Sequence, residues 1–252
     1  MINRSAAHGL MLGSLALGLL AWWNVDTLPP PDRLRPEILR DPVQVPVELP
    51  ALRKTVEGVD YGIERRYSYD ISGVVVSLHH SDSWWDYAHA EWGDHINLMD
   101  VCLAWGDNAS KGTYQSIQFS NSQWECRFET RSSAAWQAFR QDQVSNNHLL
   151  TDDRHLGHAL AGIHVGDQIR LRGFLVNYTI FRNGVAQGTR VSSDTRLDTG
   201  PGACEVMFVE SMETLSSYDR NWRLLRTLAF LTLAAAVVLW IRLPVSFDAG
   251  EP

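Results

Sequence analysis

The side chains best suited to metal chemistry gather between residues 79 and 95, where histidines and aspartates alternate with aromatic residues. Imidazole and carboxylate groups bind transition metals, and in a partly helical segment side chains three and four residues apart face one way. A divalent metal is therefore an open alternative, although the H-E-x-x-H motif of zinc peptidases is absent. The other interpretation is a polar loop over the mouth of the fold. The candidate ligands are His79, His80, Asp82, Asp86 and His89.

Tryptophans in the same segment offer a binding surface of a different kind. The indole ring is large and flat, and it is enriched where proteins bind partners. We expect these rings to form a platform for a ligand ring or for a partner helix. The residues concerned are Trp84, Trp85 and Trp92.

Four consecutive hydrogen-bonding side chains begin at Ser145 and precede two leucines. Such residues commonly pin a connection by bonding to nearby backbone groups, and we expect a connection here. The alternative is a polar pocket wall formed by Asn146, Asn147 and His148, with His148 available as an acid or base.

Charged residues surround a Gly-Pro-Gly turn between positions 192 and 205. Arg196 can pair with Asp198 or with Glu205 to form a fixed ion pair that takes part in binding. The alternative is an ordinary exposed pair, which contributes little to stability.

The three cysteines, Cys102, Cys126 and Cys204, all fall at positions where we expect strands. A buried thiol or one structural disulfide among them is expected rather than a nucleophile, and spacing does not choose the pair. We find no G-x-S-x-G elbow and no P-loop, and we assign no catalytic residue.

Alternating and β-branched runs predict most of the elements that must position these residues. The order is strands, a helical insertion, and strands again, with a bend at Gly173 and a hairpin turn at Asn183-Gly184. We expect an α+β fold that is mainly β, a small OB-like barrel with a helical insertion, or alternatively a small β-sandwich. The predicted strands are 71–78, 98–105, 116–119, 124–129, 168–176 and 204–209, with helices after Ser132-Ser133 and Asp152-Asp153.

Both ends of the chain carry apolar segments that we expect to be transmembrane helices, at 6–24 and 224–245. Trp22 and Trp23 close the first segment, as at a membrane interface, where a cleaved signal peptide would have small residues. The second is apolar around its whole circumference, which argues against an amphipathic core helix. Its uncharged run is short, at fifteen residues, but flanking leucines can lengthen it.

Seven of the chain's ten prolines lie between Pro29 and Pro50. We therefore expect a proline-rich stalk at residues 25–66. A strap packed along the domain is the alternative. The globular domain is expected at 67–216. Counting arginines near the spans favours a cytoplasmic domain, whereas the short N-terminal tail and the long domain after it are typical of a signal anchor. We favour a bacterial inner-membrane protein with a periplasmic domain.

Composition excludes several classes of protein. The 252 residues carry 22 Lys+Arg and 29 Asp+Glu, a formal net charge of −7. An acidic chain lacks the basic face that nucleic-acid binding needs. A hydrophobic content of 45% excludes a wholly disordered chain, and three cysteines are too few for a disulfide-dense scaffold.

Several motifs carry a resemblance that covers much of residues 98–209. They are VCLAWG (101–106), SNNHLL (145–150), GDQI (166–169) with GFLV (173–176), and DTGPGACE (198–205). Through them the chain resembles an uncharacterised group of bacterial membrane-anchored proteins. The resemblance implies a hydrophobic N-terminal segment ahead of one compact domain and carries no activity. The C-terminal membrane segment and the tryptophan-rich insertion depart from the simpler members.

These observations predict a non-enzymatic envelope protein whose domain binds a protein partner, forms a homo-oligomer or joins a membrane complex. A metal-dependent or acid/base enzyme acting on an envelope substrate is one alternative, and an OB-type ligand-binding module is another. No cofactor is expected, apart from the divalent metal of the enzyme alternative, and no nucleic acid.

Overall fold

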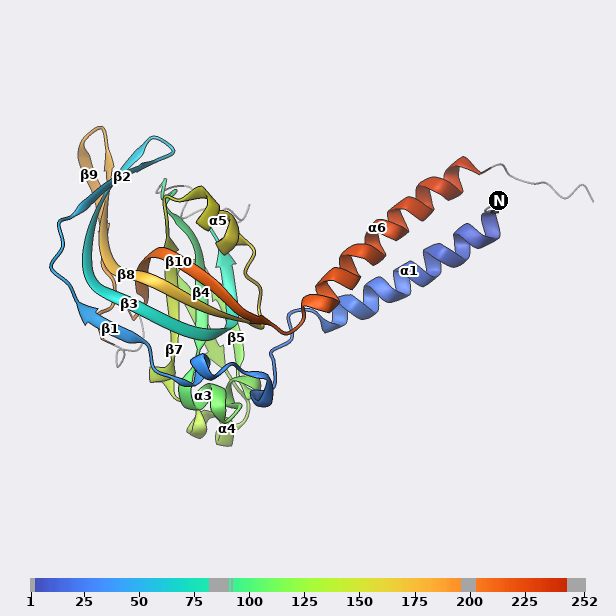
Figure 1. Ribbon diagram of the computed structural model, residues 1–252, viewed down its shortest axis with the longest axis horizontal. Helices are drawn as coiled ribbons and strands as arrows, with labels where there is room; N and C mark the ends of the chain where they lie inside the picture. The colour runs from blue at the N-terminus through green and yellow to red at the C-terminus, as the bar shows by residue number, and fades with distance from the viewer. Residues whose placement is uncertain (1–2, 82–90, 92, 196–202, 244–252) are drawn as a thin grey trace, which may run out of the picture. The chain divides into compact units, whose positions relative to one another are not determined.

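The computed structural model of the chain describes residues 3–81, 91, 93–195 and 203–243. Short 3-10 helices lie at Pro31–Arg33, Pro36–Leu39, Thr113–Ser116 and Gln141–Gln143. In chain order, the helices and strands are α1 (Arg4–Asn24), β1 (Val43–Pro46), β2 (Leu52–Val56), β3 (Val59–His80), β4 (Asn97–Ala104), α3 (Gly106–Ser110), β5 (Gln118–Ser122), β6 (Glu125–Glu129), α4 (Ser133–Ala138), β7 (Val144–Leu150), α5 (Arg154–Ala161), β8 (Asp167–Arg182), β9 (Val185–Arg190), β10 (Glu205–Ser217) and α6 (Arg220–Arg242) (Figure 1).

The chain divides into two compact units. One is the segment Leu28–Ser217, here called the domain, and the other combines Met1–Thr27 with Tyr218–Pro252 and is called the helix pair. The chain is therefore α+β and mainly β, with a long apolar helix at each end.

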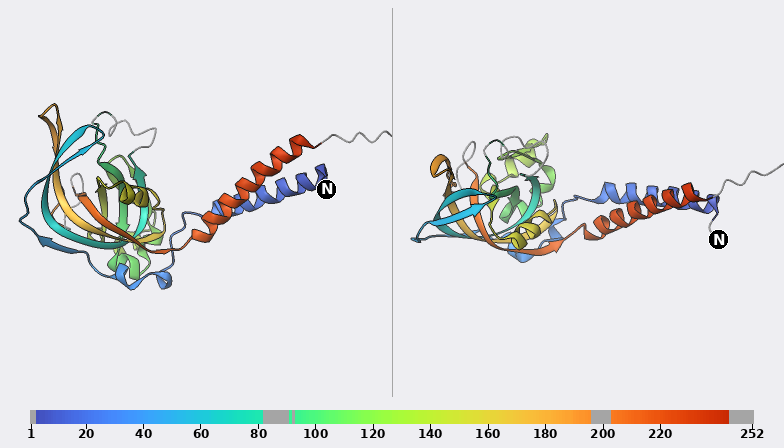
Figure 2. Two further views of the ribbon diagram at one scale, coloured as in Figure 1. Left: turned by 45° about the horizontal axis from the view of Figure 1, so that its top comes forward. Right: turned by 90° about the horizontal axis from the view of Figure 1, so that it is seen from above.

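The domain is built on an eight-stranded sheet, beside which β5 and β6 form a separate hairpin. The pairings β3–β4, β4–β7, β7–β10, β10–β8 and β8–β3 follow one another, and β7–β10 is the parallel one. The strands curve together in Figure 2. Strand β9 follows β8 through the turn at Asn183 and Gly184, whose φ angles of 50° and 76° suit the predicted hairpin turn.

The sheet forms a partial ring and not the small OB-like barrel that we expected. Strand β3 has 22 residues and pairs with β8 from Asp60 to Val74, then with β4 from Val74 to His80. The two stretches overlap only at Val74. Along the rest of its length, β3 therefore pairs with β8 or with β4, but not with both. The sheet therefore curves round without closing, because its longest strand changes partner.

The inner core lies on the face that these ring strands share. Helix α5, which the Asp153 side chain caps by accepting from the amides of His155 and Leu156, packs Leu160 into it. The buried apolar members of the inner core are Tyr69, Ile71, Val75, Met99, Val101, Leu103, Trp105, Leu149, Leu160, Ile163, Ile169, Leu171, Leu175, Met207 and Val209.

The proline-rich residues lie along the domain, which corrects the expectation of a stalk over 25–66. Strand β1 pairs with β3, with Val43 opposite Asp70, and Ile38 is fully buried. Proline lacks the amide hydrogen that a central strand needs, but an edge strand tolerates that loss. Pro46 lies in β1, at the end of the strand order. The stretch is therefore a strap of the folded domain.

The β5–β6 hairpin is fastened to the sheet by a disulfide between Cys102 of β4 and Cys126 of β6. Its turn falls at Gln123-Trp124, because Ser122 already pairs with Glu125, so the first arm runs beyond the predicted end of that strand at 119. Four aromatic rings pack together on the hairpin and beside α4. They are Phe119, Phe128, Trp136 and Phe139.

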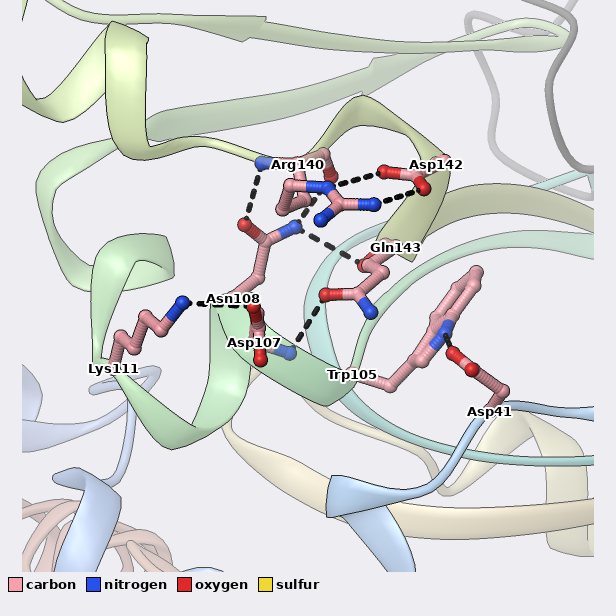
Figure 3. A network of polar contacts seen from close by, with 8 residues as sticks. All are labelled: Asp41, Trp105, Asp107, Asn108, Lys111, Arg140, Asp142 and Gln143. Carbon is pink, nitrogen blue, oxygen red and sulfur yellow. Dashed lines mark hydrogen bonds and ion pairs between the residues drawn. The ribbon is translucent and has the colours of Figure 1, made fainter.

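A polar network holds the segment before β7 against α3 (Figure 3). The Asn108 amide donates to the carbonyls of Arg140 and Gln143 at 2.7 and 3.2 Å, and its oxygen accepts from the Arg140 amide at 2.9 Å. The Trp105 indole donates to Asp41 at 3.3 Å, which ties the strap to the same region. These contacts set the point at which β7 begins.

The helix pair is held together by close packing and by bonds at both ends. A ring of Phe230 in α6 lies against Gly18 in α1, where a Cβ would meet it at 3.1 Å. At one end Asp219 accepts from the Asp26 amide at 2.8 Å and pairs with Arg223 at 2.9 Å. Figure 1 shows the two helices side by side. The α6 helix has 23 residues, longer than the uncharged run alone.

We predict that Gly173→Ala destabilises the domain by about 3 kcal/mol, since overpacking a tight site costs roughly this much. A Cβ at Gly173 would lie 2.1 Å from the Phe208 carbonyl oxygen of the neighbouring strand β10. Denaturant unfolding of the full chain in detergent measures the loss. The matched control is Gly162→Ala, whose Cβ would have its nearest contact at 3.4 Å. Equal stability of the two variants would contradict the close approach.

Candidate functional site

The face of the sheet opposite the inner core carries a row of polar residues on β4 and β7. Asp100 stands opposite His148, and Cys102 opposite Asn146, in the antiparallel pairing of these strands. Because side chains alternate along a strand, these four point away from Val101 and Leu103 of the inner core. Strand β7 therefore replaces the predicted connection at 145–150, and its polar side chains are positioned by the ladder.

A buried histidine–carboxylate contact lies at the centre of this row. His148 Nδ1 lies 2.6 Å from Asp100 Oδ1, and the two side chains are 4% and 0% exposed. The other carboxylate oxygen of Asp100 accepts a hydrogen bond from the Trp124 amide at 2.8 Å. An ionised group at this depth is stable only when it is paired and hydrogen-bonded. The pair and the hairpin turn are therefore fixed together.

Cys204, just before β10, lies beside the same histidine. Its sulfur interacts with the His148 side chain. The sulfur also accepts from Asn146 Nδ2 at 3.7 Å and donates to the Trp124 carbonyl at 3.5 Å. Cys204 is a free thiol and is partly exposed. The arrangement is a thiol, an imidazole and a carboxylate in sequence, which is the order found in cysteine nucleophiles activated by a base.

Trp124 covers this row from the hairpin turn. Its backbone φ is 63°, a left-handed conformation that bulky residues rarely adopt. The conformation is held because the Trp124 amide bonds Asp100 and its carbonyl bonds Cys204, while the Arg190 guanidinium lies 4.1 Å from its ring centroid. The hairpin therefore acts as a clamp over the polar row.

An open hollow of about 1300 Å³ leads from solvent to Cys204, between the hairpin and β7. Aromatic residues form part of its wall, and Asn146 is among its polar residues. Asn121 Nδ2 donates to Asn146 Oδ1 at 2.9 Å. All three cysteines line it. The lining residues used below are Cys102, Trp124, Cys126, Glu129, Asn146 and Cys204.

The charge state of His148 follows from its neighbours. Burial alone lowers the pKa of the imidazole, but the Asp100 carboxylate and the Cys204 sulfur outweigh it and raise the pKa of His148 to about 9. A protonated imidazole between a carboxylate and a sulfur can stabilise a thiolate.

The predicted metal ligands are not brought together by the described residues. His79 is buried on β3 and His80 ends that strand, while Asp82, Asp86 and His89 lie outside the described residues. Within the ranges that the structure describes, no group of three histidine, cysteine or acidic side chains is arranged to hold a metal ion. The tryptophans Trp84, Trp85 and Trp92 also lie outside these ranges.

The remaining predicted binding residues divide between the two faces of the sheet. Asn146 and His148 lie on the polar row, whereas Asn147 and Glu205 lie on the opposite face, where the Asn147 amide donates to Ser145 Oγ at 2.9 Å. Arg196 and Asp198, the ion-pair candidates, lie outside the described residues.

Sequence reasoning missed Asp100, Cys204 and Trp124 as members of one site. A carboxylate within the otherwise apolar run 98–105 was the available signal, because a buried charge needs a partner. No local sequence pattern identifies that partner, His148, because it lies on another strand.

No protein-family model, curated protein or solved structure matches this chain. The resemblance to bacterial membrane-anchored proteins stays a prediction.

We predict that the His148–Asp100 pair makes stability depend on pH. The folded-state pKa of about 9 lies above the usual 6.5, so the pair's stabilisation is complete below about pH 6.5 and is lost as pH rises through 9. The free energy of unfolding should fall by roughly 3 kcal/mol across this range. Denaturant unfolding measures it, and Asp100→Asn should flatten the curve. An equally steep fall in the free energy of unfolding of that variant would contradict the assignment of the pH dependence to the His148–Asp100 pair.

Proposed function

We propose that this chain is a membrane-tethered envelope protein whose extracytoplasmic β-rich domain binds a protein partner or forms a subunit of a membrane complex. The observation that carries the proposal is the pair of terminal helices. Each is long and apolar enough to cross a membrane, and both are mostly exposed. Helices of 21 and 23 residues rise about 31 and 34 Å, and the hydrocarbon core is about 30 Å thick.

The surface of the helix pair supports insertion into a bilayer. Small residues of α1 face inward, and the buried set is Ala7, Ser14, Gly18 and Ala21. Such residues let transmembrane helices approach closely. Large side chains face outward, with Leu12 exposed by 69% and Leu231 by 63%. In water this apolar surface would be unfavourable, whereas lipid chains would cover it.

An extracytoplasmic location is supported by the Cys102–Cys126 disulfide, since disulfides persist mainly in oxidising compartments. In a bacterium this compartment is the periplasm and the tethering membrane the inner membrane. The proposal thus combines two long apolar helices and one disulfide.

The strand order supports a more specific proposal for the domain, an OB-like fold. OB folds are five-stranded, partly open Greek-key barrels. Here five strands pair in succession, the pair β7–β10 is parallel, and α5 lies between β7 and β8. In OB folds the second and third strands form the ligand face, and those strands correspond here to β4 and β7. We therefore propose the hollow beside β7 as the binding surface.

The same correspondence favours a second candidate, an OB-type ligand-binding module. A small polar ligand such as a glycan would enter the hollow beside Asn146, whereas a protein partner would also contact the aromatic hairpin. The acidic net charge of −7 makes an oligonucleotide the weakest choice. A glycan binder would lose its ligand on Asn146→Ala and keep it after changes to the exposed Trp136 ring.

We predict that an epitope inserted at the Asn183-Gly184 turn faces outward across the inner membrane. The turn is exposed, and a side chain at Gly184 would meet nothing within 4 Å, so the insertion is tolerated. Protease should remove the epitope in spheroplasts but not in intact cells, and the chain should stay in carbonate-washed membranes. A soluble chain, or an epitope cut only after membranes are broken, would contradict the proposal.

We predict that a photoreactive amino acid at Glu129, which lines the hollow and is exposed, crosslinks in cells to one protein or to a second copy of this chain. Gln187, exposed on β9, is the matched control and should give no such product. Immunoblots and mass spectrometry identify the crosslinked band. If both positions label alike, or neither does, the binding surface lies elsewhere.

A further inference from the structure

A nucleophile and an electrophile lie in one hollow of the domain. The free thiol of Cys204 and the Cys102–Cys126 disulfide both line it. Asn146 links them, since it stands opposite Cys102 in the sheet while its amide donates to the Cys204 sulfur. On the other side, Cys204 contacts the carbonyl of Trp124, two residues before Cys126 on the hairpin. Cys204 thus hydrogen-bonds to Asn146, which stands opposite Cys102, and to Trp124, which lies close to Cys126 in sequence.

The side chains around Cys204 suit a thiolate. The His148 side chain interacts with the sulfur, and His148 Nδ1 lies 2.6 Å from Asp100 Oδ1, a contact that helps to fix the orientation of the imidazole. The Asn146 amide adds a donor aimed at the sulfur. A thiolate, and not a thiol, attacks a disulfide, so a cation and a donor at the sulfur favour exchange.

We propose that Cys204 and His148, with Asp100 as a positioning residue, form a thiol–disulfide exchange site whose substrate is the chain's own Cys102–Cys126 disulfide. The Cys204 thiolate attacks Cys126 Sγ, a Cys126–Cys204 bond forms and the Cys102–Cys126 bond breaks. Cys102 leaves as a thiolate and takes the proton carried by His148. One disulfide and one thiol are present before and after, so no oxidant or reductant is consumed.

The consequence is a clamp that can change its attachment. In the starting state the hairpin is bound to β4 through Cys102, and after exchange it is bound to the segment before β10 through Cys204. The exchange depends on neither the tether nor a partner, so it can be tested on the purified full chain in detergent.

The first experiment uses Cys102→Ser in an oxidised and reduced glutathione buffer at neutral pH, followed by acid trapping and peptide mapping. We expect a Cys126–Cys204 disulfide, and we expect adding His148→Gln to slow its formation by at least about tenfold, because less thiolate is present. Cys126 and Cys204 each carrying glutathione, with no bond between them, would overturn the proposal.

The second experiment uses the wild-type chain, so that it stands even if Cys102→Ser does not fold. The rate at which Cys204 forms a mixed disulfide with oxidised glutathione is followed by mass spectrometry between about pH 6 and 9. We expect the folded chain to react at least about tenfold faster at the acid end than the urea-unfolded chain.

Two variants separate reactivity from structure in this measurement. His148→Gln and Asp100→Asn should both remove the rate advantage of the folded chain at the acid end, and Cys204→Ser should abolish the product. A folded wild-type chain that reacts no faster there than the unfolded chain, or variants that keep the full advantage, would overturn the proposal.

Discussion

The long strand β3 is the constraint on which the rest of the domain depends. It pairs with the strap strands β1 and β2, with β8 along most of its length and with β4 at its end. Because the partner changes at Val74, the sheet curves into a partial ring with an inner apolar face and an outer polar row. A one-residue slip of β4 would exchange the faces and bring Asp100 into the inner core.

The outer row is stable because its polar groups satisfy one another. A buried carboxylate costs several kcal/mol unless it is paired, and Asp100 has His148 on one oxygen and the Trp124 amide on the other. The Trp124 carbonyl in turn accepts a hydrogen bond from the Cys204 thiol. The contacts that fasten the hairpin are therefore the same contacts that hold the thiol beside the imidazole, so stability and reactivity are coupled at this site.

The terminal helices are two candidate membrane spans, and the disulfide is consistent with an extracytoplasmic domain. Two long apolar helices pack on each other through small residues, and the domain between them in sequence carries a disulfide and a free thiol. An oxidising compartment keeps the disulfide formed, and a thiol partly exposed beside it is then positioned for exchange.

Local patterns in the sequence determined the apolar terminal helices, most of the strands, the Asp153 cap and the Asn183-Gly184 turn, since each depends on neighbouring residues alone. The proline-rich segment was expected to be a stalk, with a strap only as the alternative, because edge pairing of proline depends on a strand that is distant in sequence. Strand β7 was missed because buried polar residues form a strand when another strand satisfies them. Which cysteines pair, and that Cys204 meets His148 beside Asp100, was decided only by the tertiary structure. The Cys102–Cys126 disulfide joins residues 24 positions apart and the His148–Asp100 contact joins residues 48 apart, and the pairing of β4, β7 and β10 places Asp100, His148 and Cys204 in one region.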